Sequence, residues 1–272
     1  VLAGGIAHDF NNLLTVIIGN ADLALREMSP ISPARTMVEE VRTASLRAAE
    51  LTGQMLAYSG KGRFVVHPID INELVGEISH LLSVSISKKV ALRYEFAPEL
   101  PAVEGDPSQL RQVVMNLIVN ASEAIGEDEG VVTLATGVLR ADSNYLSGTF
   151  LQDDLPPGDY VWIEVIDTGC GMDADAQSKL FDPFFTTKFT GRGLGLAAVL
   201  GIVRGHCGTI KVYSELGKGS TFKVLLPASD QPSRPLGRPE TETDADWRGS
   251  GNVLVVDDEE GVRNLAAHFI ER

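Results

Sequence analysis

The sequence of 272 residues predicts a multidomain chain with three folded regions. We expect a helical hairpin at residues 1–62, an α+β domain at residues 63–228, a linker at residues 229–251, and the first strand and helix of an α/β domain at residues 252–272. Helical apolar periodicity in the first region, mixed strand and helix patterns in the second, and a continuous apolar run in the last predict this division.

Residues 1 to about 60 have the pattern of two amphipathic helices separated by a Pro- and Ser-rich loop at residues 29–33. The apolar positions of the first helix are Leu2, Ile6, Phe10, Leu13 and Ile17. Those of the second are Met37, Val41, Ala44, Ala48, Leu51 and Met55. Two such helices bury little surface alone, so we expect a homodimer through residues 1–60 that forms a four-helix bundle.

His8 lies on the polar side of the first predicted helix. At about 100° per residue it falls opposite the apolar stripe, Asn12 shares its side, and Asp9 lies at the boundary. A neutral imidazole nitrogen is a good nucleophile near pH 7. By itself, however, an exposed histidine carries no specific function.

The second region predicts helices layered on one mainly antiparallel sheet. Its expected strands are residues 90–96, 131–138, 159–166, 209–214 and 221–226. Its expected helices lie near residues 71–85, 107–126 and 194–205.

The last region begins with the apolar run of residues 253–256, which is typical of a buried parallel strand. Asp257 and Asp258 follow it, and such paired carboxylates are suitable ligands for Mg²⁺. The chain opens and closes within helical patterns, so we expect it to be part of a longer protein.

Composition excludes several classes of function. The formal charge of −14, without a basic run, argues against binding nucleic acid or anionic lipid. No apolar run reaches the roughly 20 residues of a membrane helix, so we expect no direct membrane contact. Two cysteines without metal-ligand spacing favour a reducing, cytoplasmic location.

Three motifs in the α+β region carry chemistry. Asn116 and Asn120 lie one helical turn apart, and their amide oxygens suit Mg²⁺ or phosphate-bound water. Asp167 ends a strand as an acceptor for an exocyclic amine, and Gly169 and Gly171 allow close backbone approach.

The third motif is a glycine cluster that leads into a helix and favours phosphate. It comprises Gly191, Gly193, Leu194 and Gly195, with Lys188 and Arg192 as nearby cations. The preceding segment has the composition of a mobile lid. Each of the three motifs is weak alone, since paired asparagines often lie on a solvated face.

In their order along the chain, these motifs resemble the ATP-binding domain of histidine kinases. The resemblance implies a Bergerat-type (GHKL) α/β sandwich that binds ATP and Mg²⁺. It assigns the metal to Asn116 and Asn120, adenine to Asp167, phosphate to the glycine cluster, and the adenine edge also to Thr221.

Upstream, AGGIAHDFNNLL resembles the H box of the same family and implies that His8 is the phosphoacceptor. Asp9 would orient the imidazole or accept its proton, and the spacing of Asp9 and Asn12 resembles the family's phosphatase motif. Leu13 replaces a proline found in many relatives, so we expect a straighter helix.

The segment VLVVDDEEGVR resembles the start of a response-regulator receiver domain. The sequence is thereby identified as a member of the hybrid sensor histidine kinases, whose partner is a receiver domain in cis or in trans. Two alternatives are a GHKL-type ATPase clamp and a catalytically silent dimerising scaffold. The clamp enzymes place a glutamate where this chain has Asn116, and the scaffold predicts missing nucleotide ligands.

Overall fold

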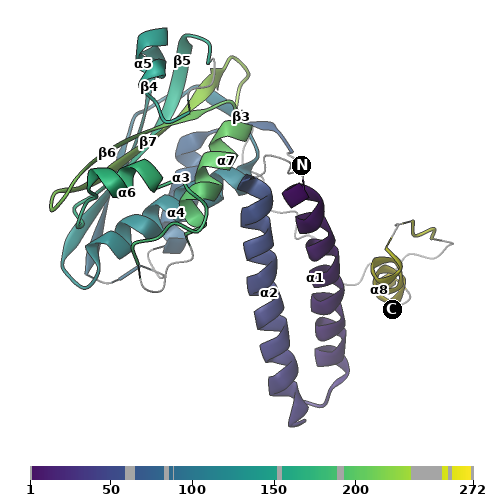
Figure 1. The fold of residues 1–272 in the computed structure, drawn as a ribbon. Coiled ribbons are helices and arrows are strands. Elements are labelled where there is room, and N and C mark those ends of the chain that lie inside the picture. Colours follow the sequence, from purple (N-terminus) through teal and green to yellow (C-terminus); the bar gives the residue numbers. More distant parts are fainter. Residues whose placement is uncertain are drawn as a thin grey trace. The chain divides into compact units, whose positions relative to one another are not determined.

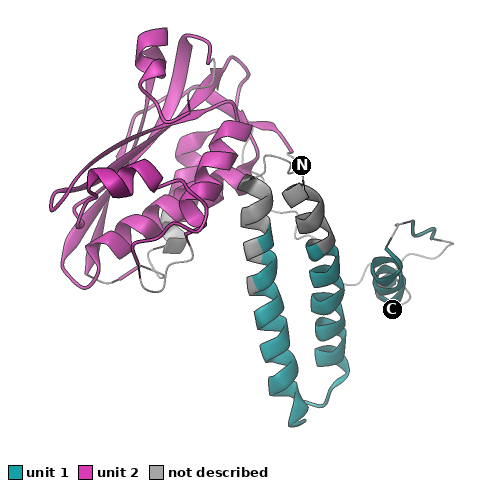
Figure 2. Ribbon diagram, viewed as in Figure 1, with its two compact units in different colours: residues 1–61, 240–272 teal, residues 62–239 magenta. Residues whose placement is uncertain are grey.

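The computed structural model describes residues 2–58, 65–82, 86–87, 89–151, 155–188, 193–233, 253–256 and 259–270. In chain order the elements (Figure 1) are α1 (Leu2–Glu27), α2 (Ala34–Tyr58), β1 (His67–Ile69), α3 (Ile71–Leu82), β2 (Val90–Phe96), β3 (Ala102–Gly105), α4 (Pro107–Ile125), β4 (Gly130–Ala141), α5 (Ser143–Ser147), β5 (Gly158–Asp167), α6 (Ala174–Lys179), α7 (Gly195–Gly205), β6 (Thr209–Glu215), β7 (Gly219–Ser229) and α8 (Glu260–Ile270). They form two compact units, residues 1–61 with 240–272, and residues 62–239 (Figure 2).

The first unit contains the predicted helical hairpin. Leu14 and Ala21 of α1 are buried, and an ion pair between Arg42 and Asp22 links the two helices, with Nε and Oδ1 2.5 Å apart. Three residues of the predicted apolar stripe nevertheless stay exposed beside them: 55% of Phe10, 59% of Leu13 and 43% of Ile17 are accessible. The hairpin therefore keeps an apolar surface that its own second helix does not cover.

The second unit contains one seven-stranded sheet in the order β1-β3-β7-β5-β4-β2, with β6 paired to β7. Only the β2–β4 pair is parallel among the described pairs, which confirms the prediction of a mainly antiparallel sheet. Helices α3, α4 and α7 cover one face (Figure 1).

The core lies between these helices and the sheet. Alternate residues of β5, Val161, Ile163 and Val165, are buried toward the helices, because successive side chains of a strand point to opposite faces. On α4 the apolar face carries Leu110, Val113, Val114, Leu117 and Ile118, all buried. On the sheet's other face Lys223 forms an ion pair with Glu164 at 2.9 Å and lies over the Trp162 ring.

Residues 253–256 differ from the prediction. They form no strand, and 86% of Leu254 is exposed. A parallel strand requires a neighbour for its backbone hydrogen bonds, and in the described part of the chain none pairs with this segment. The predicted helix after it does form as α8, where Leu265 lies against Gly19 of α1. Asp257 and Asp258 lie outside the described residues.

Candidate functional site

Helix α4 carries the predicted asparagine pair. The helix begins where Asp106 Oδ1 accepts hydrogen bonds from the backbone N–H groups of Ser108 (2.8 Å) and Gln109 (3.2 Å), with Pro107 at its first turn. Asn116 and Asn120 follow on a half-buried side of α4.

The asparagine pair faces the start of α7. Asn116 Nδ2 donates to the carbonyl oxygen of Gly195 at 3.3 Å. A Cβ at Gly195 would lie 3.9 Å from both Asn116 Cγ and Asn120 Nδ2. The fold thus brings the first predicted motif against the last glycine of the third, although 75 or more residues separate them in the chain.

Asp167 occupies the end of β5, where only 4% of the residue is exposed. Its Oδ1 accepts hydrogen bonds from the N–H groups of Gly169 (2.8 Å) and Ser220 (3.2 Å). Burial raises the pKa of Asp167, and these two N–H groups and the charge of Lys188 oppose that rise. Among the described residues none donates to Oδ2, which leaves this oxygen as an acceptor for an amine.

The glycines after Asp167 have a packing role that the sequence did not indicate. A Cβ at Gly169 would lie 2.6 Å from the carbonyl carbon of Ala124, and one at Gly171 (φ 66°) would lie 2.0 Å from the carbonyl oxygen of Glu215. Close approach to the protein's own backbone thus requires glycine at both positions. They hold the loop against α4 and the β6–β7 hairpin.

Thr221 does not take the place predicted for it. In the β5–β7 pair Asp167 is opposite Ser220, whereas Thr221 is opposite Ile166. Because side chains alternate along a strand, Thr221 points to the other face of the sheet and Ser220 shares the face of Asp167. We therefore assign Ser220, and not Thr221, as the residue beside the aspartate. This correction by one residue depends on the strand register.

The segment between Asp167 and α7 holds the predicted cations and glycines. Lys188 Nζ lies 2.6 Å from Glu123 Oε2 on α4. Phe184 has φ 68° and donates its N–H to the Gly193 carbonyl at 2.9 Å. Leu194 is buried immediately before α7. Gly191 and Arg192 lie outside the described residues.

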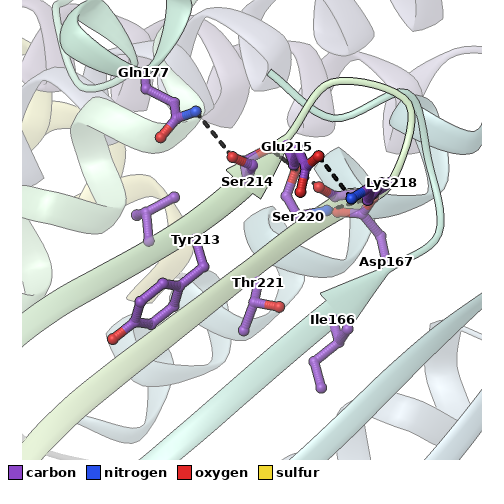
Figure 3. A pocket seen from close by; sticks show the side chains of 11 residues that line it. Ile166, Asp167, Gln177, Tyr213, Ser214, Glu215, Lys218, Ser220 and Thr221 are labelled. Atoms are coloured by element: carbon purple, nitrogen blue, oxygen red, sulfur yellow. Dashed lines mark hydrogen bonds and ion pairs between the residues drawn. The ribbon is translucent and has the colours of Figure 1, made fainter. Parts of the chain in front are cut away.

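A cavity of about 380 Å³ lies beside the β6–β7 hairpin (Figure 3). The cavity is lined on the sheet by Tyr213, Thr221 and Ile166. Lys218 and Gln177 also line it. Asp167 also contributes, but among the described lining residues neither asparagine of α4 appears. We therefore locate the candidate site by the contact between Asn116 and Gly195 and by the buried carboxylate of Asp167, rather than by this cavity.

The predicted phosphoacceptor lies on α1, which runs unbroken from Leu2 to Glu27, as expected without a proline at position 13. His8 and Asp9 belong to this helix, but their side chains lie outside the described residues. Asn12 is half-buried, and its Nδ2 lies 3.5 Å from Glu259 Oε1.

Comparisons with known proteins agree with this geometry. Residues 105–230 match the family model for histidine kinase-, DNA gyrase B-, and HSP90-like ATPases. Residues 2–62 match that for the His Kinase A (phospho-acceptor) domain. Together the two matches define a phosphoacceptor helical hairpin followed by an ATPase domain.

Curated relatives and one solved structure point the same way. The chain is 40% identical to sensor kinase CckA of Brucella abortus over 96% of this chain and 28% of that protein. It is 33% identical to the sensory histidine kinase/phosphatase NtrB of Rhizobium leguminosarum over 85% of this chain and 59% of that protein. A crystal structure of full-length ShkA in complex with AMPPNP has a TM-score of 0.63 and 26% identity, covering 86% of this chain and 47% of that one.

The chain belongs to the sensor histidine kinases. It spans between about a quarter and three fifths of the length of these curated relatives. None of the described helices combines the length and apolar character that crossing a bilayer requires.

Proposed function

We propose that this chain is an ATP-dependent protein-histidine autokinase that phosphorylates His8 and passes the phosphoryl group to an aspartate of a receiver domain. The observation that carries the proposal is the meeting of Asn116, Asn120 and Gly195 in the domain that also buries the Asp167 carboxylate. Amide oxygens, a helix start and a buried acceptor are the groups that a magnesium nucleotide needs.

In this proposal Asp167 accepts a hydrogen bond from the adenine amine, with Gly169 and Gly171 shaping its loop. Asn116 and Asn120 hold Mg²⁺ with the phosphates. Helix α7 has no side-chain cap at its start, so its first N–H groups are available to phosphate. Lys188, Arg192 and the glycines from Gly191 to Gly195 complete the phosphate-binding segment.

The reaction is an in-line transfer. An imidazole nitrogen of His8 forms a bond to the γ-phosphorus, the bond to the bridging oxygen breaks, and ADP leaves with that electron pair. Asp9 orients the ring or takes its proton. Bound Mg²⁺ would supply neutralisation of the phosphate charge. NtrB is named a kinase/phosphatase, which supports a second, phosphatase activity for this chain. In that activity Asn12 would position a water molecule against the phosphorylated partner.

We further propose that the chain forms a homodimer through residues 1–60. The exposed stripe of Phe10, Leu13 and Ile17 supports this, because a dimeric bundle would bury it. Residues 63–228 would be the ATP-binding domain, residues 229–251 the linker, and residues 252–272 the start of a receiver domain, with Asp257 and Asp258 as magnesium ligands once that domain is complete. An enzyme that consumes ATP in this way would work in the cytoplasm.

The ATPase alternative needs a general base near the phosphates. Asn116 occupies that position and an amide cannot act as one. Glu123, two turns further along α4, holds the ammonium of Lys188 at 2.6 Å, which disfavours it as a base. The scaffold alternative is disfavoured by the retained Asp167 and asparagine pair.

One experiment separates the three. The chain is incubated with γ-labelled ATP and Mg²⁺, and protein-bound label is tested in acid and in alkali. The autokinase predicts label that is lost in acid and kept in alkali. Label found only as free phosphate would support the ATPase, and no ATP binding would support the scaffold.

A further inference from the structure

His206 is a buried histidine outside the groups assigned above. It follows α7 directly, with 7% of the residue exposed. The backbone N–H of Asp106 donates to its Nε2 at 3.0 Å, and its Nδ1 lies 2.8 Å from the carbonyl oxygen of Ile202. Because a backbone N–H only donates and a carbonyl only accepts, Nε2 is the acceptor and Nδ1 the donor in these two hydrogen bonds.

The bond to Asp106 joins two helices that line the candidate nucleotide site. Asp106 caps the start of α4, and His206 follows the end of α7. At the opposite end of α7, Gly195 accepts the hydrogen bond from Asn116. The helices are therefore antiparallel, and α7 is linked at both of its ends to the first half of α4.

The spacing between the two links is nearly the same along both helices. The rise from position 106 to 116 of α4 is about 15 Å, and that from 195 to 206 along α7 is about 16 Å, at 1.5 Å per residue. A shift of α7 along α4 would consequently break both links together. The remote link fixes where the first turn of α7 lies relative to the asparagine pair.

The surroundings of the remote link are closely packed and hydrogen-bonded. A Cβ at Gly105 would lie 2.8 Å from His206 Cδ2, so the end of β3 lies directly against the imidazole edge. Asp106 uses Oδ1 to cap α4 and Oδ2 to accept the N–H of Val65 at 3.2 Å. The end of α7 and the junction between β3 and α4 thus meet at this ring, and Val65 is bonded to the same junction.

We propose that His206 is a positioning residue of the nucleotide site, which holds α7 in register with α4 and thereby places Gly195 against Asn116 and Asn120. The inference rests on the proposed ATP binding, and it concerns a residue that does not itself touch nucleotide. It requires the acceptor at Nε2, because the hydrogen bond from Asp106 joins the end of α7 to the start of α4. It does not require the donor at Nδ1, because the hydrogen bond to Ile202 stays within α7.

Two substitutions separate these roles. In His206→Gln the side-chain oxygen reaches the position of Nε2 and can accept from Asp106. In His206→Asn the shorter amide reaches only the position of Nδ1 and can donate to Ile202. Both lose the ring, so a general packing defect would affect them alike.

The test is a calorimetric titration of the whole chain with Mg·ATP, at a temperature below each unfolding midpoint. We expect His206→Asn to bind about fivefold more weakly, the equivalent of one lost hydrogen bond, and His206→Gln to stay within about twofold. In autophosphorylation the KM for ATP should follow the same split, with kcat changed less than about twofold.

Equal losses in the two variants, or unchanged binding in His206→Asn, would overturn the inference. If His206→Asn does not fold, His206→Gln decides alone: binding within about twofold supports the inference, and a loss of about fivefold contradicts it. A wild-type chain that binds no ATP would instead contradict the proposed function.

Discussion

The two units of the chain differ in how completely they bury their apolar side chains. In residues 62–239 the core residues of the strands and helices, such as Ile163 and Leu117, are almost fully buried. In the hairpin, the stripe of Phe10, Leu13 and Ile17 remains largely accessible. The ATP-binding unit therefore buries a core of its own, whereas the phosphoacceptor unit leaves apolar side chains that only another surface could cover.

Asp167→Asn should have the largest effect and should affect only the function of the ATP-binding unit. Loss of the anionic acceptor is expected to weaken ATP binding about 100-fold and leave the dimer intact. The measurements are calorimetry with Mg·ATP and sedimentation equilibrium. Asp159→Asn, on the exposed opposite end of β5, is the matched control, and equal weakening in both variants would contradict the role of Asp167.

The same substitution tests the raised pKa. A carboxyl whose folded pKa lies above its unfolded value contributes stability below the unfolded pKa, and that contribution is lost as pH rises through the folded pKa. Asp167→Asn should therefore unfold at the same or a higher temperature than wild type at neutral pH, with the gap closing in acid. A variant less stable at neutral pH would contradict the burial argument.

Gly219→Ala should damage only the ATP-binding unit. Its Cβ would lie 1.9 Å from the Asp167 carbonyl oxygen at φ 94°, and we expect a loss of about 3 kcal/mol in unfolding free energy. Gly217→Ala, in the same hairpin at φ 78° with nothing within 4 Å, should lose only about 1 kcal/mol. Urea unfolding measures both, and equal losses would refute the close-contact explanation.

Leu13→Glu should act on the hairpin alone. A charge on the exposed stripe is expected to weaken the dimer at least about tenfold, with ATP affinity unchanged. Sedimentation equilibrium measures the association. Leu216→Glu places the same charge at an exposed position of the ATP-binding unit and should leave the dimer unaffected; a dimer that tolerates Leu13→Glu would remove the proposed interface.

Glu123→Gln should have the smallest effect. It releases Lys188, whose ion pair with Glu123 is partly exposed, and we expect ATP to bind about twofold more tightly because such pairs contribute little. Calorimetry against Glu129→Gln, an exposed residue beyond α4, provides the comparison. Weaker binding would instead show that Glu123 itself supports the nucleotide.

Much of the fold could be predicted where the signal is local. Strand β2 has the predicted bounds, and the main helices and other long strands differ by a few residues. Strands β1 and β3, of three and four residues, are too short to show alternation, and their partners are distant in the chain. The segment at residues 253–256 has strand composition but no partner among the described residues.

The residues of the candidate site likewise fall into those with a local sequence signal and those without one. The asparagine pair and Asp167 carry local signals, one a helical spacing and the other a strand end followed by glycines. Choosing Ser220 over Thr221 requires the register of β5 and β7, and a shift of one residue reverses the face. The bond between His206 and Asp106 spans 100 positions, which no local pattern reveals.

The most direct test concerns the acceptor itself. The whole chain is labelled with γ-labelled ATP in three forms: wild type, His8→Gln, and His268→Gln, which removes an exposed histidine of α8. We predict acid-labile label at wild-type level in His268→Gln and none in His8→Gln, with ATP binding equal in all three. Label that persists in His8→Gln would contradict the assignment of His8 as the phosphoacceptor.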